Sequence, residues 1–140
     1  MHVLSLPMGA DTGGVSAAIG RAFDGVEGWQ YHAIISTLNH LDYPRDLAWS
    51  RSTLGHYWRW ADVVHLHHNF KAFEVFRKKG IRVPHRPLVV EFHGTGFREN
   101  HKPYLTDMRQ RGAIGLVSTL DLWLLAPQEL EWLPCPVRIQ

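Results

Sequence analysis

Short apolar runs alternate with amphipathic stretches along this chain of 140 residues. Near-continuous apolar runs of this length are typical of strands covered on both faces, and they occur at 3–6, 30–35, 62–67, 88–92 and 113–118. Helical spacing of apolar residues, together with length and capping residues, predicts helices between them, at 15–23, 47–61, 69–79 and 102–111. This alternation favours a parallel sheet. We therefore expect residues 1–140 to form a single α/β, Rossmann-like domain of about five to six strands, with helices on both faces.

The loops that follow two of these strands each contain two glycines, Gly13 and Gly14 in one and Gly94 and Gly96 in the other. Parallel sheets bind ligands outside the carboxyl ends of their strands, at the point where the strand order reverses. In the common order 3-2-1-4-5, the first predicted strand and the fourth, 88–92, are neighbours. Gly13-Gly14 follows the first strand and His93-Gly94 follows the fourth. We therefore expect both pairs to face one crevice.

Gly13 and Gly14 stand immediately before the predicted helix at 15–23. Because glycine has no side chain, a ligand can approach the backbone there, and a helix N-terminus favours an anion. The segment is not G-x-G-x-x-G and lacks the lysine of a P-loop, so it predicts neither a dinucleotide fold nor a phosphate hydrolase. An anion site and a plain strand-to-helix turn remain the two interpretations.

Histidines gather around the end of the strand at 62–67. Alternation places His65 and His67 on one face and His68 on the other. Histidine is a common metal ligand, but a site of this type usually includes a carboxylate. Asp62 lies at the far end of the strand. We therefore expect no metal, and interpret these histidines as the polar edge of a ligand crevice.

The strand at 88–92 carries a charged residue in an apolar setting. Glu91 and His93 share one face of it, and a buried Glu91 needs a partner, which we expect to be a His or Arg on a neighbouring strand. His93 is a candidate for ligand contact or proton transfer, with capping of the next turn as the alternative. Arg98 and Lys102 follow, as an anion site or as an ordinary helix start.

Composition narrows the class of protein only modestly. Fifteen basic and 13 acidic residues give a net charge of +2, which does not demand a nucleic-acid partner. A single cysteine, Cys135, cannot form an internal disulfide and fits a reducing compartment. No apolar run approaches the ~20 residues of a membrane span, and the start lacks the basic region of a signal peptide. We expect a cytoplasmic location.

Five segments, taken in order, resemble a known family. They read G-A-D-T-G-G-V-S-A-A-I-G-R-A-F, A-D-V-V-H-L-H-H, P-L-V-V-E-F-H-G-T-G, G-L-V-S-T-L-D-L and W-L-P-C-P-V. Their order and spacing are similar to those of the amino-terminal domain of family-4 glycosyltransferases, which are retaining enzymes of the GT-B fold. The resemblance extends from about Val3 to Val137.

The resemblance implies transfer of a sugar from a nucleotide-sugar, with no metal or other cofactor. His93 would be the catalytic residue, which contacts the donor sugar and stabilises charge as the bond to phosphate breaks. The resemblance places donor contacts at Gly13, Gly14 and Gly94, and acceptor contacts at Asp11, Thr12 and Arg98.

The family holds most of its donor nucleotide on a carboxy-terminal domain that carries an E-x7-E motif. Glu129 and Glu131 lack that spacing, and the chain ends at Gln140. We therefore expect this chain to supply the acceptor side and part of the donor-sugar site, completed by a second chain or by self-association. A non-catalytic module that binds a sugar, a nucleotide or a protein is the alternative. Only the arginine content favours a role on nucleic acid.

Two further expectations concern the crevice and the tail of the chain. The crevice side should be open to solvent, including Gly13-Gly14, the 67–68 turn and the loop at 93–98. The tail at 120–137 contains three prolines, which prevent one long helix. We therefore expect the tail to fold back on the sheet or to dock on another chain.

Overall fold

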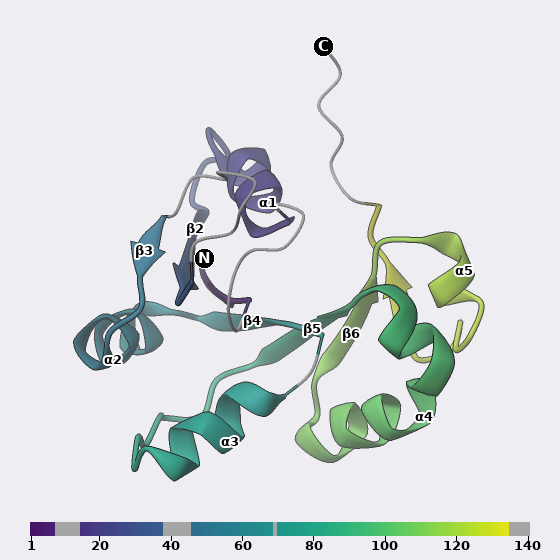
Figure 1. The fold of residues 1–140 in the computed structure, drawn as a ribbon. Coiled ribbons are helices and arrows are strands. Elements are labelled where there is room, and N and C mark those ends of the chain that lie inside the picture. Colours follow the sequence, from purple (N-terminus) through teal and green to yellow (C-terminus); the bar gives the residue numbers. More distant parts are fainter. Residues whose placement is uncertain (8–14, 38–45, 69, 135–140) are drawn as a thin grey trace.

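The computed structural model describes residues 1–7, 15–37, 46–68 and 70–134. Among these residues, seven parallel strands form one sheet in the order β3-β2-β1-β4-β5-β6-β7 (Figure 1). The strands are β1 (His2–Leu6), β2 (Gln30–Ile35), β3 (Leu47–Ala48), β4 (Val63–His67), β5 (Leu88–Phe92), β6 (Ile114–Val117) and β7 (Leu130–Trp132). The helices are α1 (Val15–Phe23), α2 (Arg51–Trp60), α3 (Lys71–Lys78), α4 (Gly94–Arg111) and α5 (Leu120–Trp123). The predicted α/β, Rossmann-like class is confirmed.

The two faces of the sheet are covered unequally. Helix α1 lies on one face, whereas α2, α3 and α4 lie on the other (Figure 1). The chain moves from β1 to β2 in one direction and from β3 to β6 in the other, and right-handed crossovers then place the helices on opposite faces. The apolar stripe predicted for α1 is only partly buried: Ile19 and Phe23 border an apolar groove, and Ser16 is the buried residue.

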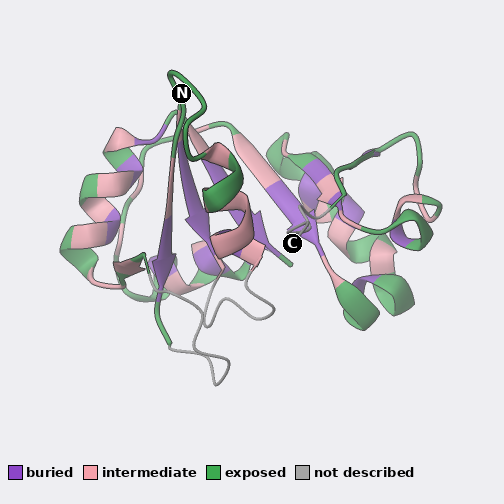
Figure 2. Cartoon of the chain, turned by 90° about the horizontal axis from the view of Figure 1, so that it is seen from above, coloured by how far each residue is buried: buried purple, intermediate pink, exposed green. Residues whose placement is uncertain are grey.

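The main hydrophobic core lies between the sheet and α2, α3 and α4. Central strand residues are buried there (Figure 2), and they are Leu4, Leu6, Val64, Leu66, Val90 and Phe92. Trp58 of α2 and Phe76 of α3 pack into the same core. Because this face holds most of the buried apolar surface, the α1 face is left available for polar side chains.

The order 3-2-1-4-5 is observed, but its members differ from those predicted. Residues 47–61 do not form one helix: Leu47–Ala48 pairs with β2 as β3, and α2 begins at Arg51, after Ser50 Oγ accepts a hydrogen bond from the Thr53 amide at 3.0 Å. The fourth strand is therefore 63–67, which lies beside β1. The prediction that the first strand neighbours 88–92 is wrong, because β4 separates the two.

The segment after β5 also differs from the prediction. The residues at 93–96 were expected to form a loop, but α4 begins at Gly94, whose φ of 62° lets the chain turn directly from β5 into the helix. Asn100 has non-helical angles and marks a kink three residues before Pro103. Leu105 and Met108 are buried, as predicted. Asn69, the predicted cap of the helix at 69–79, lies outside the described residues.

The tail was expected either to fold back on the sheet or to dock on another chain. Its described part folds back on the sheet. Helix α5 packs against β6 and β7, and β7 pairs in parallel with β6. Trp123 Nε1 donates to the Leu130 carbonyl at 3.0 Å, which ties α5 to the last strand. Within the described ranges, no helix combines the length and the apolar character needed to cross a bilayer.

Candidate functional site

The α1 face of the three central strands changes character along its length. At the amino end it presents Val3, Val63 and Val89, and at the carboxyl end it presents Ser5, His65, His67 and Glu91. The register pairs Ser5 with His65, and His67 with Glu91. These four polar residues are at most 5% exposed. Because central parallel strands are normally apolar, this buried polar row requires internal partners.

His67 links the first strand to the end of the fifth. Its Nε2 lies 3.0 Å from Ser5 Oγ and 3.2 Å from Ser16 Oγ, and its Nδ1 lies 3.1 Å from His93 Nε2. The His67 and His93 rings are nearly parallel, with centroids 5.4 Å apart. Through His67, β4 therefore connects β1 and α1 to His93, the residue that follows β5.

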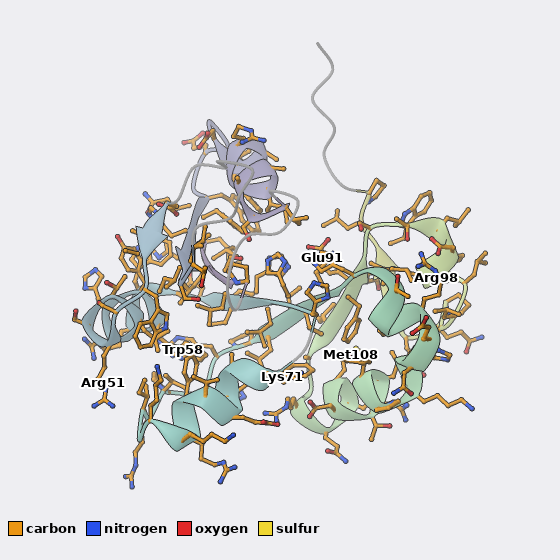
Figure 3. All side chains as sticks on the ribbon, in the orientation of Figure 1. Arg51, Trp58, Lys71, Glu91, Arg98 and Met108 are labelled. Carbon is orange, nitrogen blue, oxygen red and sulfur yellow. The ribbon has the colours of Figure 1, made fainter. Side chains whose placement is uncertain are left out.

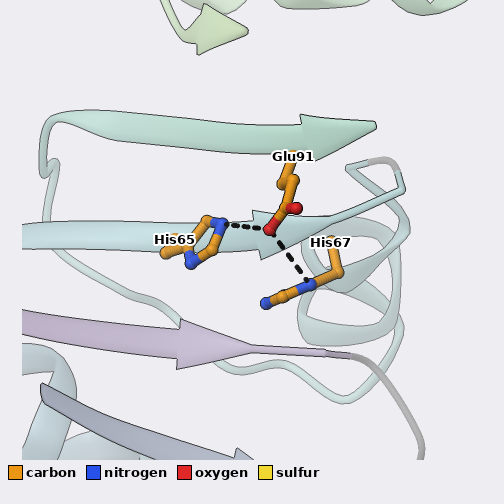
Figure 4. Close-up of side chains that lie close together, drawn as sticks. All are labelled: His65, His67 and Glu91. Carbon is orange, nitrogen blue, oxygen red and sulfur yellow. Dashed lines mark ion pairs between the residues drawn. The ribbon is translucent and has the colours of Figure 1, made fainter. Parts of the chain in front are cut away.

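Glu91 lies among three histidines. Glu91 is labelled in Figure 3, and Figure 4 draws it with two of the three, His65 and His67. Its Oε2 is 3.5 Å from His65 Nε2 and 4.0 Å from His67 Nδ1, and its Oε1 is 3.7 Å from His93 Nδ1. The expected partner on a neighbouring strand is thus histidine. However, Glu91 Oε2 and His65 Nε2 are buried with no hydrogen-bond partner, and such atoms call for an explanation.

Burial lowers the pKa of His67, the last residue of β4, and of His68, which follows it. Desolvation, followed by the charges of His65, His93 and His68, lowers the pKa of His67 well below its ordinary value near 6.5. Desolvation also lowers the pKa of His68, although the nearby Glu91 acts to raise it. A neutral imidazole has one N–H and one acceptor nitrogen. His67 therefore donates through one ring nitrogen and accepts through the other.

His68 is the one non-glycine residue with positive φ (66°) in the described part of the chain. Its amide donates to the Glu91 carbonyl at 2.8 Å, and its ring meets the His93 ring edge-on at 4.6 Å. A left-handed residue of this type is strained and is typical of functional sites. The strain at the end of β4 thus lies beside the polar cluster.

The structure brings one of the predicted site residues, His93, into this cluster. His93 occupies the N-cap position of α4 without a side-chain capping bond, so the capping alternative is wrong and the ring contacts His67 instead. Gly94 follows directly and is exposed. Arg98 pairs with Asp121 Oδ2 at 2.6 Å on the surface, and its acceptor role stays a prediction.

The expected opening of the crevice side is confirmed in part. His68, Arg98 and the 94–96 segment are exposed, whereas His67 and Phe97 are buried. A hydrogen bond from the Thr119 side chain, followed by one from Arg98, lowers the pKa of Asp121. The remaining predicted site residues, Asp11, Thr12, Gly13 and Gly14, lie outside the described residues, as does Cys135.

The position of Glu91 beside the histidines of β4 could not be found from the predicted strand order. In the predicted order, the strand at 62–67 lay far from the strand at 88–92, so Glu91 was not placed beside His65 and His67. Pairing those strands would have placed them together, because the register aligns His67 with Glu91. Ser5 gave a weaker signal, as a single polar residue inside an apolar run.

No protein-family model, curated protein or solved structure matches this chain. The likeness to glycosyltransferases therefore rests on the sequence segments alone. Because one fold serves many functions, the function has to be argued from the side chains at the carboxyl edge of the sheet.

Acidification should destabilise the protein below pH 6.5. The pKa of His67 lies below its unfolded value near 6.5, so the unfolded chain binds the proton first. The stability contributed by neutral His67 is complete above that value and is lost as the pH falls toward the folded pKa, at up to about 1.4 kcal/mol per pH unit. Urea denaturation at pH 7.5, 6.5 and 5.5 measures this loss.

The control separates His67 from the groups that face it, which are His65, His68, His93 and Glu91. His67→Gln should flatten the pH dependence between 6.5 and 5.5. His56→Gln, which alters an exposed histidine of α2, should leave it unchanged. Equal pH dependence in the parent and in His67→Gln would contradict the assignment.

Proposed function

We propose that this domain binds a nucleotide-sugar at the carboxyl ends of β1, β4 and β5, as part of a glycosyltransferase-type active site. The observation that carries the proposal is the bridge from Ser5 and Ser16 through His67 to His93. The bridge spans β1 and β4, where the strand order reverses, and ligands of parallel α/β sheets bind at that place. The class of enzyme comes from the sequence resemblance.

His93 is the member of this bridge that an incoming ligand can reach. Its side chain is 17% exposed, compared with 5% for that of His67. The contact with His67 Nδ1 at 3.1 Å holds the ring at the edge of the sheet. From that position, His93 would orient the donor sugar and stabilise charge on the departing phosphate. His67, Ser5 and Ser16 act as positioning residues.

The segment after His93 suits a phosphate-bearing ligand. Gly94 carries no side chain at the point where β5 turns into α4, and an ideal Cβ there would meet no neighbouring atom within 4 Å. The first amides of α4 follow immediately, and such amides favour anions. The resemblance implies that a further domain holds most of the nucleotide, so we propose that transfer requires that domain, in the same or in a second protein.

Replacing His93 with alanine should weaken nucleotide-sugar binding about tenfold, which corresponds to ~1.4 kcal/mol. The melting temperature should change little, because the His93 side chain is partly exposed. Isothermal titration calorimetry with a panel of uridine, guanosine and adenosine diphosphate sugars measures the affinity. His56→Ala, on the exposed side of α2, is the matched control and should bind like the parent.

Three outcomes of this titration are informative. Equal affinity of the parent and His93→Ala, at equal stability, would remove His93 from the site. A parent that binds no member of the panel at millimolar concentration would defeat the proposal. Binding without sugar transfer, in the presence of the donor-binding partner, would identify the domain as a non-catalytic binding module.

A further inference from the structure

We propose that His65, His67 and Glu91 form a binding site for a divalent transition-metal ion of the Zn²⁺ type (Figure 4). The three side chains come from the adjacent strands β4 and β5 and are at most 6% exposed. The proposed site shares His67 Nδ1 with the contact to His93, and a bound ion would take the place of that contact. The inference goes beyond the proposed sugar binding and does not rest on it.

The separations between the candidate ligand atoms fit one small cation. His65 Nε2 and Glu91 Oε2 are 3.5 Å apart, and His67 Nδ1 and Glu91 Oε2 are 4.0 Å apart. Zinc bonds to nitrogen and oxygen of about 2.0–2.2 Å place tetrahedral ligand atoms roughly 3.3–3.6 Å apart. All three ligand atoms lie within 4.8 Å of one another, so binding of one ion would require side-chain rotations that bring them closer together.

Two of the ligand atoms are otherwise unsatisfied. Glu91 Oε2 and His65 Nε2 are buried and have no hydrogen-bond partner, although they face each other across 3.5 Å. A buried carboxylate without a compensating charge is costly. A divalent cation would satisfy both atoms at once and would offset the cost of placing a carboxylate in a central strand.

The second nitrogen of each histidine meets a hydroxyl group. Tyr31 Oη lies 3.4 Å from His65 Nδ1, and Ser5 Oγ lies 3.0 Å from His67 Nε2. When these nitrogens carry the ring protons and donate to the hydroxyls, the opposite nitrogens present their lone pairs toward Glu91. Outer hydrogen bonds of this type orient the histidines of metal centres and select their tautomers.

The donor set selects the class of ion. Two imidazoles and one carboxylate suit Zn²⁺, Co²⁺, Ni²⁺ or Fe²⁺, whereas Mg²⁺ and Ca²⁺ prefer oxygen ligands throughout. Three protein ligands leave a further position for solvent or a ligand, as in catalytic zinc sites. His93 Nε2 is 3.1 Å from the same His67 nitrogen, so this position would lie on the His93 side. Glu91 supplies the carboxylate that Asp62, at the other end of the strand, cannot supply.

The test uses the full chain after removal of metal by a chelator. Isothermal titration with ZnCl₂ should show one saturable site, and CoCl₂ should produce the visible absorption of a low-symmetry Co²⁺ centre. Zn²⁺ should also raise the melting temperature, because it binds the folded state selectively. MgCl₂ should neither bind at a saturable site nor raise the melting temperature. Absence of a saturable Zn²⁺ site at millimolar metal would overturn the proposal.

Variants separate this site from adventitious binding by other histidines. Loss of a ligand should exceed the ~10–100-fold effect of an outer partner, so Glu91→Gln and His67→Gln should weaken Zn²⁺ more than about 100-fold, and Ser5→Ala by ~10–100-fold. His32→Gln alters a histidine–aspartate pair at 3.0 Å outside the cluster and should bind like the parent.

Glu91→Gln also provides a readout that a purely structural role would not produce. It keeps the shape of the side chain but removes the buried charge, so the metal-free variant should melt at or above the temperature of the metal-free parent. Its melting temperature should no longer rise with Zn²⁺. Unchanged Zn²⁺ affinity in Glu91→Gln, or equal losses in Glu91→Gln and His32→Gln, would show that His65, His67 and Glu91 do not form the metal site.

Discussion

Replacement of Trp58 by alanine should lower the free energy of unfolding by about 3–5 kcal/mol. The side chain is 1% exposed and lies between α2 and α3 (Figure 3). Its ring packs edge-on against Phe73 and Phe76, at centroid distances of 5.9 and 5.7 Å. Its Nε1 donates to the Pro84 carbonyl at 2.7 Å. Truncation would therefore open a cavity and remove the partner of a backbone acceptor.

Urea denaturation measures the loss, with two controls on the same helix. Trp58→Phe keeps an aromatic ring but loses the bond to Pro84, so its cost should be smaller than that of the alanine variant. Trp60 is only partly buried, although it stacks on His2 at 4.5 Å, and Trp60→Ala should cost clearly less than Trp58→Ala. A cost for Trp58→Ala no greater than that for Trp60→Ala would contradict the packing argument.

The fold class could be predicted from the sequence because it depends on local patterns. Apolar runs mark the central strands, and alternation with helices implies parallel pairing. The short strand β3 could not be predicted in this way. Leu47–Ala48 is too short to show a period of two, and it is a strand only because it pairs with Ile34 and Ile35 of β2. Because β3 was not predicted, the strand at 62–67 was counted as the third instead of the fourth, and the strand at 88–92 as the fourth instead of the fifth.

The start of α4 was missed for a related reason. Glycine disfavours helix, so Gly94 and Gly96 predicted a loop. The structure places these residues in the first turn, where Phe97 stacks on Phe92 with ring centroids 4.4 Å apart. This contact is set by the packing of α4 on the sheet. The stacking of Phe97 on Phe92 outweighs the low helix propensity of glycine, and the residues around Gly94 do not predict it.

Single residues of the candidate site could be predicted from the sequence, but the contacts between them could not. His93 and Glu91 stood out because polar side chains at the end of a buried strand require partners. Their meeting with His65 and His67 depends on the pairing of β4 with β5, which is a long-range property. The donor and acceptor roles of Asp11, Thr12, Gly13 and Gly14 stay predictions.

The core and the candidate site are linked through Phe92. Phe92 lies between Glu91 and His93 in the sequence, is fully buried, and points to the opposite face of β5. Its ring stacks on Phe97 and meets Tyr104 at 5.9 Å. Since Phe97 belongs to the first turn of α4, Phe92 fixes the start of that helix, and with it the position of His93.

Phe92→Ala should therefore lower the free energy of unfolding by about 3–5 kcal/mol and should also disturb the His93 ring. Imidazole nitrogen resonances report the contact between His67 and His93 without any ligand. Phe76→Ala removes a similarly buried ring from α3 and should cost a comparable amount while leaving those resonances in place. Phe92→Leu should cost less than about 1.5 kcal/mol. Unchanged His93 resonances in Phe92→Ala would mean that other contacts hold the start of α4.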